Sequence, residues 1–313
     1  MPDPSTVHFD VALTNVSIAF RNTGLVAREV APEVMVRRQG DRYFIHDPLR
    51  EAARSIADFR APGTEAREVD FTLSSDSYFC DDHALESALP DEERDNADEP
   101  LTPEIDRVEF LTDRILLNQE VQLVDRLRTG GLGTSNPVAD TEGWDDTDSD
   151  PIAQIDAARS AIIGGVQQMP NLLVLSQPVY TALRNHPKVL ERVRYSQLGV
   201  VGTGVLAELL DVERVLVARA MRNTAGGGQQ PVMEYVWGRD ALLLHVPPRP
   251  ALKSMAAALT FCWAEAMGSS RGHSVQTWRE ERRKATMIRA QKYYDQKVIA
   301  PAAGWLFRNT IAE

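Results

Sequence analysis

Apolar and polar positions alternate along residues 25–48, the first stretch with a clear structural signal. Val30, Val34 and Val36 occupy even positions, and a Gln-Gly-Asp triplet at 39–41 interrupts the pattern before a second apolar run. Alternation is typical of a half-buried strand, and glycine beside a turn-forming residue ends it. The pattern therefore predicts a strand, a turn and a second strand.

Residues 1–35 show no sustained helical period and carry early prolines, so we interpret them as an N-terminal arm with short strands. A strand with unpaired edges can pair with another chain. We therefore expect Leu25 to about Val36 to lie on an adjacent subunit. The residues expected to contact other subunits are Val30, Val34, Val36, Arg37, Arg38, Arg42, Tyr43, Arg54 and Arg60.

Residues 36–75 carry seven arginines and two turn signals, at 39–41 and at 61–63. This composition predicts a long two-stranded extended loop with a basic middle. The loop is either an ordinary solvated hairpin or a contact with acidic surface on a neighbouring subunit. Residues 81–100, by contrast, are strongly acidic, and such a run is usually a solvated face or a connector.

A long helix is the clearest element of the N-terminal half. Thr102 suits the N-cap and Pro103 the first helical position, and apolar residues continue at helical spacing to a Gly-Gly pair at 130–131. The predicted helix spans 102–128 and is about 39 Å long at the usual rise per residue. Its apolar face shifts between the two halves, so we expect it to contact different partners along its length.

Helices and strands alternate between residues 151 and 250, which is typical of a compact α/β domain. Asp150 and Pro151 suit the N-cap and first turn of one helix, and Ser176 suits the N-cap of another. The predicted helices cover 151–167, a segment from 177, 187–195 and 205–210, and the predicted strands cover 172–176, 214–219, 233–237 and 242–246.

The C-terminal region is predicted to return to strands. Residues 254–265 and 277–291 have the composition of long strands on either side of a glycine-serine turn. The aromatic segment 305–307 is either a closing strand or a short helix. A sheet that flanks the long helix and is completed by the C-terminus would be a discontinuous domain.

Composition restricts the class of protein. The 313 residues include 45 acidic and 34 basic side chains, a net charge of −11, which argues against a protein that grips nucleic-acid phosphates. The basic and aromatic residues of 282–294 could stack on nucleic acid, but in an acidic protein we favour a strand surface that faces acidic neighbours. No apolar run approaches the length of a membrane helix, and no secretory signal is visible. We expect a protein without membrane contact that stays in the cytoplasm where it is made.

Candidate chemical sites are few. The aspartates at 145, 146, 148 and 150 could supply oxygen ligands to calcium, but they lack the glycine and glutamate of a helix-loop-helix calcium site, so a solvated loop with a helix cap is favoured. Cys80 and Cys262 lack disulfide or metal spacing and are interpreted as buried side chains. The glycine-rich segments lack a P-loop lysine, and the six histidines show no paired spacing. We therefore predict no catalytic, cofactor-binding or metal residues, and no enzyme.

Several segments, in their order and spacing, resemble the major capsid proteins of tailed bacteriophages, whose Hong Kong phage-type fold is shared with encapsulin shells and the herpesvirus capsid floor. VAREVAPEVMV with DRYFIHDP resembles the family's arm and extended loop. NLLVLSQPVYTALRNHPKVLERV with LAELLDVERVLVARA resembles its axial domain, VWGRDALLLHVPP its late strand pair, and DQKVIAPAAGWLFRNTI its C-terminal ending. The resemblance covers most of the chain from about Asn15 onward.

The resemblance implies a structural protein with an α+β fold that self-assembles into an icosahedral phage head enclosing double-stranded DNA. Its parts would be an N-terminal arm (1–35), an extended two-stranded loop (36–75), a peripheral domain (76–150 and 254–313) around a long spine helix (102–128), and an α/β axial domain (151–253).

The resemblance also implies partners and a location. Copies of the chain would form hexamers and pentamers in a closed shell, assembled in the host bacterial cytoplasm and found in the virion. A separate scaffolding protein, a portal and, as an option, a decoration protein would take part, and DNA would be enclosed without sequence-specific binding. Some relatives join subunits through a lysine–asparagine bond, but no lysine occurs between Met1 and Asp150, so no such crosslink is expected. Two alternatives stay open: an encapsulin-like compartment that encloses cargo enzymes, and a soluble oligomeric α/β enzyme.

Overall fold

The structure is a computed structural model of the whole chain. It describes residues 8–9, 24–45, 58–60, 62, 63, 65, 68, 74–97, 102–140, 142–193, 201–265 and 272–312. Most of the predicted arm and Arg54 therefore lie outside the described residues.

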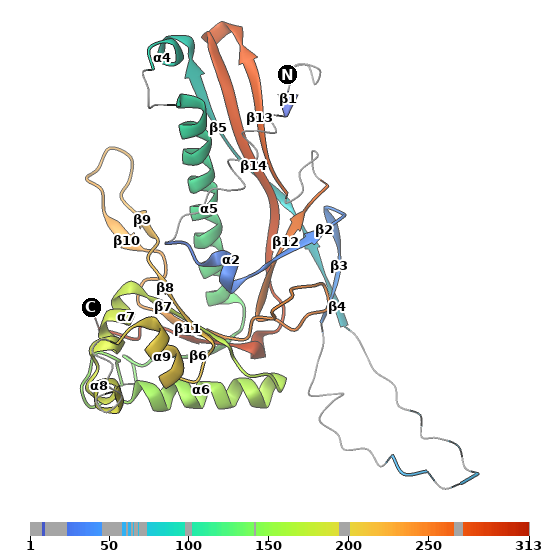
Figure 1. Cartoon of the computed structure of the whole chain (residues 1–313), viewed down its shortest axis with the longest axis vertical. Coiled ribbons are helices and arrows are strands. Elements are labelled where there is room, and N and C mark those ends of the chain that lie inside the picture. The colour runs from blue at the N-terminus through green and yellow to red at the C-terminus, as the bar shows by residue number, and fades with distance from the viewer. Residues whose placement is uncertain are drawn as a thin grey trace.

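A six-stranded sheet forms the upper part of the molecule in Figure 1, with strand order β1-β13-β14-β12-β2 and with β5 also paired to β14. Strand β2 runs parallel to β12, and the other pairs are antiparallel. The first and last thirds of the chain thus share one sheet, as expected for a discontinuous domain. The strands are β1 (His8–Phe9), β2 (Glu33–Val36), β5 (Asp81–Pro90), β12 (Ala258–Trp263), β13 (His273–Glu280) and β14 (Ala285–Val298).

The spine helix α5 (Pro103–Thr129) lies along this sheet and contacts β14 and β5 (Figure 1). Its N-terminal half packs Val108 and Ile115 against a small cluster with β5 and β14, whereas Leu123 and Leu127 belong to the main core below. The predicted change of partner along the helix is confirmed. Pro103 starts the helix as expected, but the side chain of Thr102 makes no capping hydrogen bond.

A second, five-stranded sheet has the order β6-β15-β11-β7-β8 and is covered by helices at the lower end of Figure 1. Continuous apolar runs supply β7 and β11, every residue of which is buried, as expected for strands covered on both faces. The α/β prediction for residues 151–250 is confirmed by β7 (Leu172–Ser176), β8 (Arg214–Ala218), β11 (Ala241–Leu244), α6 (Pro151–Val166), α7 (Gln177–Asn185), α8 (Pro187–Val193) and α9 (Thr203–Leu209). A hairpin of β9 (Met221–Asn223) and β10 (Met233–Tyr235) extends from it.

Two capping predictions in this region have different outcomes. Asp150 caps α6, because its Oδ1 accepts a hydrogen bond of 3.0 Å from the backbone N–H of Ala153. Ser176 precedes α7 as predicted, but its side chain makes no capping hydrogen bond. The N-cap of α6 is therefore confirmed, and at α7 the predicted N-cap position is confirmed without the side-chain hydrogen bond.

The C-terminal strands differ from the prediction in two places. The single strand expected over 277–291 is two strands, β13 and β14, because the polar run 281–284 forms a tight turn with Lys284 at φ 45°. The aromatic segment is a strand, β15 (Gly304–Phe307), but it pairs with β11 and with β6 (Gly133–Ser135). The end of the chain therefore belongs to the second sheet, although we expected 254–313 to complete the body of the spine helix.

The acidic segment is not a mere connector. Its first ten residues form β5, which pairs with β14 along its whole length, and Asp91–Asp95 forms the short helix α4. Arg289 of β14 binds Glu86 across the strands at 3.0 Å, and Arg279 of β13 binds Asp91 at 2.5 Å. The acidic neighbours of the basic C-terminal strands thus come from the same chain.

The extended loop is two-stranded at its base. Strand β3 (Gly40–Ile45) pairs antiparallel with β4 (Ser74–Phe79), as a long hairpin requires. Tyr43 and Tyr78 from this ribbon stack against Phe261 of the first sheet, with ring centroids 5.3 and 4.7 Å apart. The strand, turn and strand predicted within residues 25–48 are confirmed from Glu33 to Ile45, with the two strands in different sheets, whereas Val30 lies in a short helix.

Candidate assembly surfaces

Residues 25–36 have a place within their own chain. Helix α2 (Ala27–Val30) contacts α5, and β2 completes the first sheet beside β12. Val30, Val34 and Val36 are 0%, 6% and 3% exposed. The segment therefore packs within its own chain, and these three valines are not available as surface contacts.

Glu120 joins the arm to the rest of the molecule. This side chain of α5 is fully buried, and its Oε2 accepts hydrogen bonds from the backbone N–H groups of Ala27, at 2.6 Å, and Val26, at 3.0 Å. Its Oε1 accepts a third from Trp237 Nε1 at 2.6 Å. Burial raises the pKa of Glu120, against the opposing effect of these hydrogen bonds. One carboxyl group therefore connects α2, the spine helix and the segment between the β9–β10 hairpin and β11.

Gln119, the residue before Glu120 on the spine helix, takes part in a second buried polar contact. Lys292 of β14 is completely buried, with its Nζ 2.6 Å from Glu33 Oε1 and 2.8 Å from Gln119 Oε1. Burial opposes ionisation of Glu33, but Lys292 and Arg28 outweigh it and hold the pKa of that carboxyl below its usual value. The pair holds β2 to β14 and α5 by charge, in addition to the pairing of β2 with β12.

The lower end of the spine helix is bound to the second sheet by an ion pair. Arg128 donates to Asp240 Oδ2 from Nε at 2.9 Å and from a terminal nitrogen at 2.7 Å. The other oxygen of Asp240 accepts from the backbone N–H of Asn309 at 3.1 Å. Such a two-point contact holds the helix end, the loop before β11 and the C-terminal segment together.

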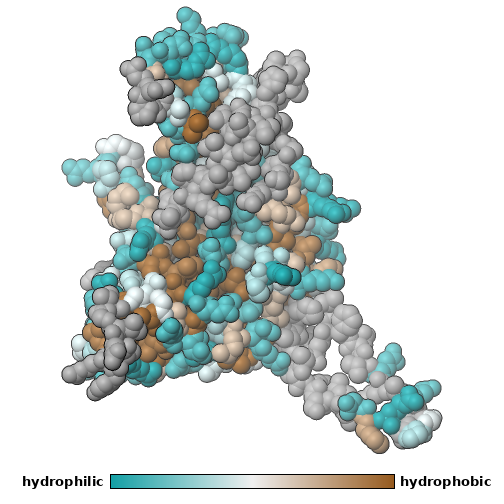
Figure 2. All heavy atoms as spheres, in the orientation of Figure 1, coloured by the Kyte–Doolittle hydropathy of each residue, from teal (hydrophilic) through white to brown (hydrophobic). Residues whose placement is uncertain are grey.

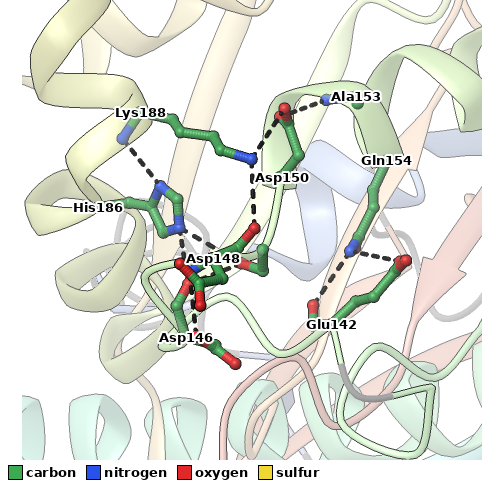
Figure 3. Close-up of polar contacts among 9 residues, drawn as sticks. Glu142, Asp146, Asp148, Asp150, Ala153, Gln154, His186 and Lys188 are labelled. Carbon is green, nitrogen blue, oxygen red and sulfur yellow. Dashed lines mark hydrogen bonds and ion pairs between the residues drawn. The ribbon is translucent and has the colours of Figure 1, made fainter.

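The aspartate-rich loop before α6 is occupied by contacts within the chain (Figure 3). Lys188 Nζ lies 3.3 Å from both the backbone oxygen of Asp148 and Oδ2 of Asp150. His186 Nε2 donates to the backbone oxygen of Asp146 at 2.9 Å, while its Nδ1 accepts from the N–H of Lys188 at 3.3 Å. Within the described residues no group of three or more metal-type ligands gathers. The favoured interpretation, a loop with a helix cap, agrees with these contacts.

The two cysteines lie in the core. Cys80 and Cys262 are both buried and free. Burial raises the pKa of each thiol to about 12. The interpretation as buried side chains is confirmed for both.

The remaining contact candidates are arginines at the surface. Arg37, Arg38, Arg42 and Arg60 are exposed, whereas Tyr43 is 2% exposed and donates its hydroxyl to Asp76 at 3.0 Å. Sequence reasoning missed the aromatic residues beside them. Phe59, next to Arg60, is 88% exposed, and Phe44 and Phe79 of the ribbon are also exposed. The exposed arginines Arg37, Arg38, Arg42 and Arg60, together with the exposed rings of Phe44, Phe59 and Phe79, are called the loop surface below.

An acidic groove lies at the opposite end of the molecule. It has a volume of about 700 Å³ between α4 and the start of α5, and its lining includes Glu92, Glu93, Asp106 and Phe110. Phe110 is 57% exposed, and Arg107 at the groove pairs with Glu93. Figure 2 shows mostly hydrophilic side chains around this upper end. The groove thus combines net negative charge with an exposed aromatic ring.

No helix among the described residues has the length and apolar character needed to cross a membrane.

No protein-family model matches the chain. A protein named major capsid protein from Pseudomonas phage JBD67 is 28% identical over 308 residues, covering 97% of each chain. Another of that name, from Burkholderia phage BcepMu, is 26% identical over 242 residues, covering 76% of each.

Solved structures share the fold. A phage-related protein from Bordetella bronchiseptica RB50 matches with a TM-score of 0.74 at 22% identity, over 96% of this chain and 97% of that one. The capsid of cyanophage P-SCSP1u matches with a TM-score of 0.58 at 10% identity, over 92% and 89%. A virus-like particle from Pyrococcus furiosus matches with a TM-score of 0.56 at 10% identity, over 95% and 96%. The chain therefore has the fold of these shell-forming proteins.

Proposed function

We propose that this chain, a homologue of phage major capsid proteins, is the structural subunit that assembles with copies of itself into the icosahedral head shell of a phage. The observation that carries the proposal is similarity over 97% of both chains to a protein named major capsid protein. The fold agrees with that of the solved cyanophage capsid over 92% of this chain. A virion location follows from the same relatives, which favour neither the cargo compartment nor the soluble enzyme.

We infer that the role is structural rather than catalytic. The buried ionisable groups support this, because Glu33, Lys292 and Asp240 are each engaged in contacts that join distant segments. Such pairs fix the arrangement of the segments they join, and these three groups are not poised as bases in an open cleft.

Copies of the chain would form hexamers and pentamers, with the axial domain, residues 151–253, around the symmetry axes. We propose that a separate scaffolding protein and a portal complete the head and that a decoration protein is optional. The net charge of −11 supports a wall that encloses double-stranded DNA without sequence-specific binding.

We propose that the loop surface of one copy contacts the acidic groove of the next. The loop surface presents exposed arginines and the groove presents carboxylates, each displays an exposed aromatic ring, and they lie at different ends of the molecule. Complementary patches at different places on one molecule give head-to-tail contacts, which close when the rotation between copies permits.

Electron microscopy and light scattering of the expressed chain test the main proposal. Closed shells of many subunits are expected, and a uniform particle below about ten subunits would overturn the proposal in favour of a small oligomer. Recovery of shells filled with a host enzyme, and never with DNA in infected cells, would instead favour the cargo compartment.

Changing Arg37, Arg38 and Arg42 to glutamate tests the loop contact. We expect a lower yield of shells, and a greater loss at low salt than at high salt, because screening weakens charge repulsion. Arg222 to glutamate, in the β9–β10 hairpin, is the control. Equal yields for the triple variant and the unchanged chain would show that these arginines are merely solvated.

A further inference from the structure

Glu120 differs from the other buried carboxylates of the molecule. Glu33 is paired with Lys292 and Asp240 with Arg128, so each has a cation at hydrogen-bonding distance. In the part of the chain that the structure describes, Glu120 has no ion pair and is held by N–H donors alone. Its charge is therefore stabilised only as long as those donors stay in place.

The donors come from two segments that are far apart along the chain. Val26 and Ala27 belong to the arm, and Trp237 lies beyond the β9–β10 hairpin, more than 200 residues later. Both reach the carboxyl group on the spine helix at 2.6 Å. Each set of donors reduces the cost of keeping the carboxylate buried, so the two sets favour one another's presence.

We propose that Glu120 is a positioning residue that couples the attachment of the arm to the seating of Trp237. Removing the Trp237 hydrogen bond leaves the buried carboxylate less compensated, so water is more readily admitted and the arm detaches more often. Because such coupling is reciprocal, detachment of the arm loosens Trp237 to the same extent.

The coupling has a use that rests on the proposed function. A subunit that occupies both pentamers and hexamers must adjust its parts relative to one another. A shared carboxylate makes the arm and the neighbourhood of Trp237 adjust together rather than independently. The coupling itself is a property of the single chain, so it can be measured whether or not shells form.

Trp237→Phe is the direct test, because it removes the Nε1 donor and keeps an aromatic ring in the core. Hydrogen exchange followed by mass spectrometry on the full chain reports the amides of residues 24–31. Loss of one hydrogen bond to a charged group predicts about 10- to 100-fold faster exchange there. The lost bond ends on Glu120 rather than on the arm, so the effect reaches those amides through the shared carboxylate.

Trp144→Phe is the matched control. Trp144 is 0% exposed and Trp237 1%, and Trp144 Nε1 donates to Gln154 at 2.8 Å, away from the arm. Trp144→Phe should speed hydrogen exchange in residues 24–31 only to the extent that it lowers the global stability of the chain. The proposal is overturned if the two variants alter the arm equally, or if Trp237→Phe leaves it unchanged.

Glu120→Gln gives a second readout. Its amide cannot accept from all the donors, so exchange in residues 24–31 and the tryptophan fluorescence should change together across a denaturant series below unfolding. Arm exchange that changes without any fluorescence change would contradict the coupling. Where this variant fails to fold, the pair of Trp→Phe variants still decides.

Discussion

The two sheets of the molecule are stabilised in different ways. The second sheet has β7 and β11 at its centre, and their neighbouring side chains are apolar and buried. In the first sheet, the buried polar residues Lys292 and Gln296 of β14 contact Gln119 of the spine helix. Apolar contact is non-directional, whereas buried hydrogen bonds require particular partners. The second sheet is thus stabilised mainly by apolar packing, whereas the first is stabilised by specific hydrogen bonds and ion pairs between distant segments.

Among the single substitutions considered, Lys292→Met should lower the free energy of unfolding most, through the first sheet. It leaves Glu33 and Gln119 buried without their main partner, and breaking a buried ion pair costs about 3–5 kcal/mol. Chemical denaturation of the unassembled chain measures the loss. Lys297→Met, on the same strand with a partly exposed pair, should cost less than about 1 kcal/mol. Similar losses of unfolding free energy for both variants would mean that the first sheet does not depend on the contact of Lys292 with Glu33 and Gln119.

Leu243→Ala should test the apolar sheet with a slightly smaller effect. Leu243 is 0% exposed and lies between Leu173 and Trp305 in the strand register, so the cavity should cost about 2–5 kcal/mol. Leu190→Ala, at an exposed position of α8, should change the free energy of unfolding by about 0.5 kcal/mol or less. A cost at Leu243 no larger than this control would contradict close packing there.

Mild acid should weaken the first sheet through His273. Burial, with Lys292 and Arg28 nearby, lowers the pKa of His273 to about 3, while the unfolded chain has the ordinary value near 6.5. The unfolded state binds the proton first, so stability present above about pH 6.5 is lost as the pH falls towards 3. At pH 5 the loss should be about 2 kcal/mol.

Denaturation at pH 7 and pH 5 measures this difference. His273→Gln should reduce it, and His245→Gln, with a partly exposed ring, should not. An unchanged pH dependence in His273→Gln would show that the acid sensitivity arises elsewhere.

Local patterns were enough to predict strands β7, β8 and β11 of the second sheet and the long helix. The apolar runs of β7 and β11, the proline at the start of α5 and the aspartate before α6 each act within a few residues. These signals need no knowledge of distant segments.

The first sheet depends on partners that no local pattern reveals. Strand β2 is completed by β12, more than 220 residues later, so residues 25–36 looked as if they lacked a partner. The acidic composition of residues 81–95 concealed β5 and α4, whose charges are met by arginines of β14 and β13. In the sequence, Gln119 and Glu120 resemble the polar face of a helix. The one sequence feature that indicates a buried ion pair is Lys292, which lies among aromatic residues of β14.

The parallel pairing of β2 with β12 also sets an order for the making of the protein. A ribosome releases residues 33–36 long before it has synthesised residues 260–263, so β2 waits without its partner during most of translation. The first sheet can close only after residues 260–263 have been synthesised, and until then the β2 edge is open to other nascent chains. Translation products that stop before residue 260 therefore cannot acquire this half of the fold.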